Sequence, residues 1–70
     1  MMEPIEILVV DDDDTFRALL SKELRSRGHK TDTARGVVEA LEKLRAHEYN
    51  VALVDLRLPD GDGLEVVRRA

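Results

Sequence analysis

Two short apolar runs that each end in aspartate constrain the fold of this 70-residue chain more than any other feature. The first, Ile5 to Val10, has no polar residue after Glu6 and leads into four consecutive aspartates. The second, Val51 to Val54, leads directly into Asp55. Apolar runs without polar alternation are typical of strands that are covered on both faces, as in a parallel sheet. We therefore expect two central parallel strands whose carboxyl ends carry acidic side chains.

Amphipathic helices and one weaker strand fill the chain around these runs. The first helix is predicted from an apolar stripe at helical spacing, formed by Phe16, Leu19, Leu20 and Leu24. A second stripe predicts another helix, formed by Val37, Ala40, Leu41 and Leu44. Lys30 to Ala34 is a weak strand, polar enough for a sheet edge. Leu64 and Val67 begin a third helix.

This alternation of strands and helices predicts an α/β fold with a doubly wound parallel sheet. Strand–helix–strand units form parallel sheets with crossover helices. The apolar strands should be central and the polar strand an edge, which gives the strand order 2-1-3. Right-handed crossovers then place the first two helices on opposite faces. Ligand sites in such sheets lie where the winding reverses, outside the carboxyl ends of the strands.

Three aspartates are expected to meet at this point. Asp11 and Asp12 follow the first strand and Asp55 ends the third, and neighbouring strands lie about 4.8 Å apart. Like charges about 5 Å apart repel by roughly 3 kcal/mol per pair at an effective dielectric constant of 20. Mg²⁺ would neutralise them, because it prefers oxygen ligands and keeps waters that a phosphate can replace. The cluster thus indicates attack by an aspartate on a phosphoryl donor, assisted by Mg²⁺.

Other polar residues have simpler explanations. Asp13 and Asp14 precede a helix and are expected to cap it or to interact with its dipole. The segment Asp60 to Gly63 is expected to be a turn and a helix cap, because the spacing and the final Glu of an EF-hand are missing. His29 and His47 are expected to be solvated surface residues.

Composition excludes several classes of function. The net charge of −4 argues against a nucleic-acid surface on this segment, since phosphate backbones attract an excess of Lys and Arg. The chain has no cysteine, so a disulfide framework or a cysteine-based metal site is impossible. No apolar run approaches the roughly 18 residues of a membrane span. We expect a cytoplasmic domain without membrane contact.

The two acidic motifs together resemble the receiver domain of two-component response regulators. The motifs are residues 7–12, ILVVDD, and residues 53–64, LVDLRLPDGDGL. Their order, spacing and positions at strand ends fit that family. The resemblance implies a flavodoxin-like, doubly wound sheet with strand order 2-1-3-4-5. Residues 1–70 would then be the N-terminal part of a single receiver domain, without the fourth and fifth strands.

The resemblance also implies a role for each site residue. Asp55 would accept a phosphoryl group from a sensor histidine kinase. Asp12 and Asp55 would bind Mg²⁺ by their carboxylates, and Asp11 would act mainly through a metal-bound water. Arg57 would offer its backbone carbonyl to the metal. The domain would be a signalling phosphoacceptor rather than an enzyme, in a parent protein with an output domain of the kind that binds DNA.

The family's remaining phosphoryl-binding residues fall outside this chain. They are a Thr or Ser at the end of the fourth strand and a Lys at the end of the fifth. The lysines of this chain are predicted on the two helices and the edge strand, at Lys22, Lys30 and Lys43. We therefore expect an impaired phosphoacceptor. The strand Val51 to Val54 would have an open apolar edge, so we also expect a homodimer formed through that edge or through the uncovered sheet face.

The sequence leaves two alternative functions open. Residues 7–15 also resemble the first motif of haloacid-dehalogenase-type phosphatases, with Asp11 as nucleophile, Asp13 as general acid/base and Thr15 as phosphate binder. That interpretation leaves Asp55 unexplained. A pseudo-receiver that serves only as a protein-interaction module is the other alternative, and the presence of both Asp12 and Asp55 speaks against it.

Overall fold

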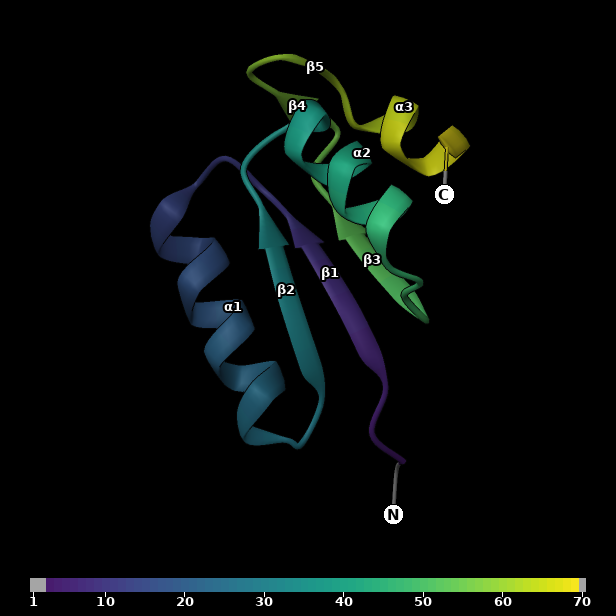
Figure 1. Ribbon diagram of the computed structural model, residues 1–70. Coiled ribbons are helices and arrows are strands. Elements are labelled where there is room, and N and C mark those ends of the chain that lie inside the picture. Colours follow the sequence, from purple (N-terminus) through teal and green to yellow (C-terminus); the bar gives the residue numbers. More distant parts are fainter. Residues whose placement is uncertain (1–2, 70) are drawn as a thin grey trace.

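A three-stranded parallel sheet with helices on both faces forms the body of the molecule in the computed structural model, which describes residues 3–69 (Figure 1). The elements in chain order are β1 (Glu6–Val10), α1 (Asp14–Ser26), β2 (Lys30–Ala34), α2 (Val37–Ala46), β3 (Val51–Val54), β4 (Arg57–Leu58), β5 (Gly61–Asp62) and α3 (Gly63–Arg69). The sheet has the order β2-β1-β3 with both pairings parallel. The predicted fold class and strand order are confirmed.

The strands of the sheet end level with one another. Val10 pairs with Ala34 in β2 and with Val54 in β3. The ladder continues one residue further: the Asp11 N–H donates to the Ala34 carbonyl (3.1 Å) and the Asp55 N–H donates to the Val10 carbonyl (2.9 Å). The aspartates that follow β1 and β3 are therefore held by backbone hydrogen bonds at one edge of the sheet.

The helices lie on opposite faces of the sheet, as the right-handed crossovers predicted (Figure 1). α1 lies over β1 and β2 on one face, whereas α2 and α3 cover the other. The apolar core fills the face under α2 and α3, and its buried members are Leu8, Val10, Ala34, Val37, Ala40, Leu58 and Val66. Gly28, with φ +91°, follows the end of α1 in the left-handed region that glycine adopts without strain.

Two local features differ from the sequence expectations. The segment after Asp55 contains a small antiparallel hairpin, β4 and β5, and its residue Leu58 packs into the core. His29 is only 7% exposed, so the expectation of a solvated histidine is wrong. Its Nδ1 accepts the Ile5 N–H (3.2 Å), because the turn into β2 brings it beside the start of β1. His47 is exposed, as expected, beside the carboxylate of Glu6.

Among residues 3–69, no helix combines the length and the apolar character needed to cross a membrane.

Candidate functional site

The structure brings together the three aspartates that the sequence analysis singled out. Asp11, Asp12 and Asp55 each present a carboxylate oxygen, and these oxygens lie within 4.8 Å of one another. Asp11 and Asp55 are half-buried, whereas Asp12 is exposed. The cluster forms because β1 and β3 are parallel neighbours, so the residues that follow them emerge at the same edge.

Local hydrogen bonds orient Asp11 and Asp55. Asp11 Oδ1 accepts the Asp13 N–H (2.9 Å), and the Arg17 guanidinium donates to the Asp11 carbonyl (2.7 Å). Asp55 Oδ1 accepts the Arg57 N–H (3.1 Å). Each carboxylate thus has one oxygen tied to the backbone two residues further along the chain.

Gly63 allows the start of α3 to approach the backbone of Asp55 closely. A Cβ at Gly63 would collide with the backbone carbonyl oxygen of Asp55, so any larger residue would push α3 away from β3. The Gly63 N–H donates to the Leu56 carbonyl (3.0 Å), which closes this turn. The start of α3 is thereby packed directly against the backbone of Asp55.

The other two aspartates of the first run have local structural roles, as expected. Asp13 is the N-cap of α1, and its carboxylate accepts the Phe16 N–H (3.0 Å). Asp14 lies in the first turn and pairs with Arg17 (2.5 Å). The hydrogen bond and the charge of Arg17 hold the pKa of Asp14 below its ordinary value. Neither residue belongs to the acid cluster.

No protein cation balances the cluster in the described part of the chain. The ion pairs found among residues 3–69 involve other acids, and none includes Asp11, Asp12 or Asp55. Three carboxylates confined this closely repel one another unless a cation lies among them. Their donor set consists of hard oxygen atoms and is partly open to solvent, which fits Mg²⁺.

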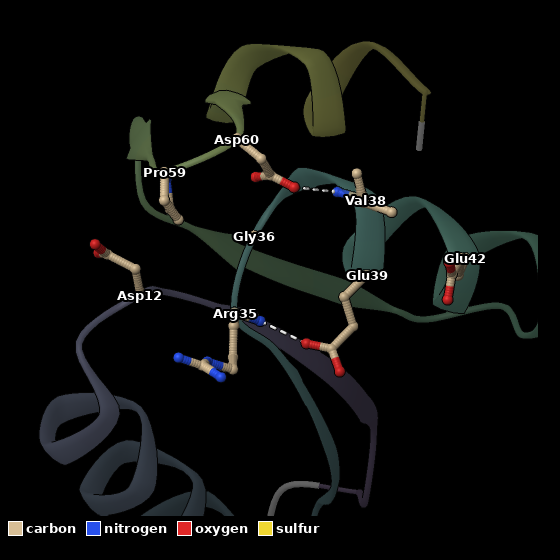
Figure 2. A pocket seen from close by; sticks show the side chains of 8 residues that line it. All are labelled: Asp12, Arg35, Gly36, Val38, Glu39, Glu42, Pro59 and Asp60. Atoms are coloured by element: carbon tan, nitrogen blue, oxygen red, sulfur yellow. Dashed lines mark hydrogen bonds between the residues drawn. The ribbon is translucent and has the colours of Figure 1, made fainter.

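The cluster lies between two hollows in the surface. Figure 2 shows the first, a pocket of about 400 Å³ in which Asp12 lies across from Pro59 and Asp60. The second, about 470 Å³, is a mostly apolar groove beside Asp11 and Asp55. Its lining residues are Val9, Val10, Asp11, Phe16, Leu20, Leu53, Val54 and Asp55. The acids can thus be reached from open surface on both sides.

Asp60 has a role that the sequence did not predict. Its carboxylate accepts the N–H groups of Val37 (2.6 Å) and Val38 (2.9 Å) at the start of α2. These two hydrogen bonds hold the pKa of Asp60 below its ordinary value. The only hint in the sequence is that a glycine, Gly36, precedes the second apolar stripe and cannot cap a helix with a side chain. The predicted cap of α3 is present, because Asp62 accepts the Leu64 N–H (2.9 Å).

Matches to known proteins cover nearly all of the chain. The family model described as "Response regulator receiver domain" matches residues 7–70. The virulence transcriptional regulatory protein PhoP of Salmonella typhimurium is 42% identical over 65 residues, which are 93% of this chain and 29% of PhoP. The sensor protein EvgS of Escherichia coli is 36% identical over 67 residues, which are 96% of this chain and 6% of EvgS. The chain thus spans less than a third of these relatives.

Solved structures agree in fold. The response regulator TrrA of Thermotoga maritima, solved in complex with Mg(2+)-BeF, superposes with a TM-score of 0.83 at 41% identity, covering 90% of this chain and 55% of that one. A CheY-like receiver domain protein of Methanospirillum hungatei superposes with a TM-score of 0.90 at 31% identity, covering 96% and 54%. The chain spans about half of each.

Proposed function

This chain belongs to the response regulator receiver domain family, and on that basis we propose that Asp55 is a phosphoryl acceptor. The observation that carries the proposal is the meeting of Asp11, Asp12 and Asp55 at one sheet edge. A carboxylate oxygen of Asp55 would attack the phosphorus of a phosphorylated donor. The bond from phosphorus to the donor breaks as the new P–O bond forms, and the product is an acyl phosphate.

Each cluster residue has a distinct part in the proposal. Asp12 and Asp55 would hold Mg²⁺ by their carboxylates, Asp11 would act through a bound water, and the Arg57 carbonyl would complete the protein ligands. When bound, the ion neutralises charge between the acceptor carboxylate and the incoming phosphoryl group. Because Asp55 Oδ1 accepts the Arg57 N–H, Oδ2 is the oxygen we assign to the attack. The Mg(2+)-BeF complex of TrrA supports this choice of metal.

The proposed partners follow from the family. The donor would be a sensor histidine kinase, and residues 1–70 would be the N-terminal part of a single receiver domain. PhoP is a transcriptional regulatory protein and EvgS is a sensor protein, so receiver segments similar to this chain occur in both kinds of parent. We propose that the parent protein carries an output domain that regulates transcription, because PhoP is more similar to this chain than EvgS is.

The phosphatase alternative is the less favoured interpretation. It requires Asp13 as a general acid/base, whereas Asp13 lies outside the acid cluster and uses one carboxylate oxygen to accept the Phe16 N–H as the N-cap of α1. The family match also covers the segment around Asp55 that the phosphatase interpretation leaves unexplained.

Metal binding can be tested without any phosphoryl donor. Mg²⁺ titration followed by amide chemical shifts should perturb residues 11–12 and 55–57. Asp12→Asn should weaken binding because it removes one ligand. Glu65→Gln, which removes an acid of α3 outside the cluster, is the charge-matched control and should bind like the wild type. Unchanged shifts at residues 11–12 and 55–57 would contradict the metal site.

The acceptor itself is tested by locating the covalent phosphate. After incubation with acetyl phosphate and Mg²⁺, borohydride reduction converts an aspartyl phosphate into homoserine, which mass spectrometry can place. We expect homoserine at Asp55 and none in Asp55→Asn. Occupancy should be low, because no lysine in residues 3–69 pairs with the cluster to stabilise the phosphoryl oxygens. Homoserine at Asp11 would favour the phosphatase, and the absence of both Mg²⁺ binding and label would favour an interaction module.

A further inference from the structure

The first amides of α2 have no acceptor side chain at the N-cap position of the helix. Its N-cap residue is Gly36, which has no side chain to accept the amide hydrogens of the first turn. Those amides have no acceptors within the helix. Asp60 takes this place from the far end of the β3–α3 connection, with Oδ1 accepting from Val37 (2.6 Å) and Oδ2 from Val38 (2.9 Å). Figure 2 shows the second of these bonds.

Two glycines let the hairpin come this close to the helix. A Cβ at Gly36 would lie 2.5 Å from Asp60 Oδ1, and a Cβ at Gly61 would lie 3.1 Å from Cγ2 of Val37. Asp60 and Gly61 therefore dock together on the first turn of α2. Asp60 contributes charge-assisted hydrogen bonds at the positive end of the helix dipole, and Gly61 contributes close packing.

Asp60 is also part of the turn of the β4–β5 hairpin. Pro59 and Asp60 join the two strands, and the ladder pairs Arg57 with Asp62. The Arg57 N–H in turn donates to Asp55 Oδ1 (3.1 Å). A two-residue strand thus connects the hairpin tip to the backbone beside the proposed acceptor.

We propose that Asp60 is a positioning residue, which ties the β4–β5 hairpin to α2 and so holds the Arg57 backbone in place beside Asp55. The Asp60 carboxylate is bonded to α2 and lies outside the acid cluster, so it acts through the hairpin. The two hydrogen bonds between Asp60 and α2, which we call the tie, do not depend on any ligand. The expected effect on Mg²⁺ affinity rests on the proposed function.

Two variants separate this role from simple helix capping. Asp60→Ala uncaps α2 and releases the hairpin at the same time. Adding Gly36→Ser supplies a local N-cap, since serine is favoured at that position. The three atoms nearest to a Cβ at position 36 all belong to the Asp60 carboxylate, which Asp60→Ala removes. The double variant therefore restores the cap without restoring the tie.

Three measurements are made on the wild type and on both variants: melting temperature, ¹⁵N relaxation of residues 56–62, and the Kd for Mg²⁺. Asp60→Ala should lower the melting temperature, mobilise the hairpin and weaken Mg²⁺ binding by up to roughly tenfold. Roughly tenfold is the low end of the cost of losing a group bonded directly to a metal ligand, and Asp60 acts one step further away. The double variant should recover the melting temperature alone.

Recovery of hairpin rigidity and Mg²⁺ affinity in the double variant would overturn the proposal, because Asp60 would then be only a helix cap. Wild-type affinity in Asp60→Ala would overturn it as well. If the wild type binds no Mg²⁺, the proposed metal site fails, and the relaxation data then decide whether the tie exists.

Discussion

The two faces of the sheet differ in how completely helices cover them. Under α2 and α3, a buried apolar cluster extends from β2 across β1, and α3 packs on β3. On the other face α1 covers β1 and β2, and the side chains of β3 stay open. Val51 and Leu53 are each 40% exposed there, beside Phe16 at 50%. β1 is covered on both faces, since Leu8 and Val10 are 0% exposed on one side and Ile7 and Val9 are 4% and 1% exposed on the other, so the open part of the α1 face lies over β3.

Topology explains this difference. With the order β2-β1-β3, the crossover from β2 to β3 must pass over β1, so α2 covers the middle of the sheet. The crossover from β1 to β2 joins a central strand to an edge strand, so α1 lies over that pair only. The open part of the second face forms the groove of about 470 Å³ that ends at Asp11 and Asp55. The less covered face is therefore the one that leads to the acid cluster.

The largest expected effect is the difference in the free energy of unfolding between two variants, each with one leucine truncated on one face. Leu8→Ala leaves a cavity in the covered face and should lower the free energy of unfolding by about 2–5 kcal/mol. Leu53→Ala, at a side chain that is 40% exposed, should cost about 1 kcal/mol. A 70-residue chain has little stability to spare, so Leu8→Ala should be close to unfolded at room temperature. Urea titration followed by circular dichroism measures both, and equal losses would contradict the comparison.

The sequence predicted those parts of the molecule that follow from local pattern and from parallel strands ending together. The strand order and the meeting of Asp12 with Asp55 belong to this class. The contact of Asp60 with Val37 does not, because 23 residues separate them and no periodicity connects a hairpin tip to a helix start. The burial of His29 was missed for a similar reason, since its partner Ile5 lies 24 residues away.

The open side of β3 should also control self-association. Within residues 3–69, β3 pairs only with β1, and no charged residue interrupts Val51–Val54, so its outer backbone groups can pair with a second copy. We propose a two-fold dimer in which two β3 edges pair antiparallel, with packing of the uncovered faces as the alternative.

Placing one charge on this strand tests the dimer. Val51→Lys should shift the chain to monomer while changing the free energy of unfolding by less than about 0.5 kcal/mol. Val67→Lys, on the exposed side of α3, is the matched control and should stay dimeric. Sedimentation equilibrium at tens of micromolar separates the outcomes, and a folded wild type at the 7.9 kDa monomer mass would rule the dimer out.

The smallest expected effect is a loss of stability at alkaline pH, and it concerns a tyrosine at the rim of the covered face. Tyr49 packs against the apolar cluster and its hydroxyl donates to Asp32 Oδ2 (2.6 Å). Burial, then the hydrogen bond to Asp32 and the charges of Asp32 and Glu6, raise the pKa of Tyr49 to about 12. The His47 ring lies edge-on to the phenol, with centroids 4.9 Å apart.

The raised pKa means that the folded state favours the neutral phenol. Its contribution to stability is therefore complete below about pH 10, the ordinary tyrosine value, and is lost as the pH rises towards 12. Tyr49→Phe cannot ionise, so its stability should fall less steeply than that of the wild type across this interval. Tyr49 is the chain's single tyrosine, so tyrosinate absorbance near 295 nm reports its titration directly. A titration midpoint of Tyr49 near pH 10, about the ordinary tyrosine value, in the folded protein would contradict this prediction. It would show that solvent reaches the rim of the covered face as freely as it reaches β3 on the opposite face.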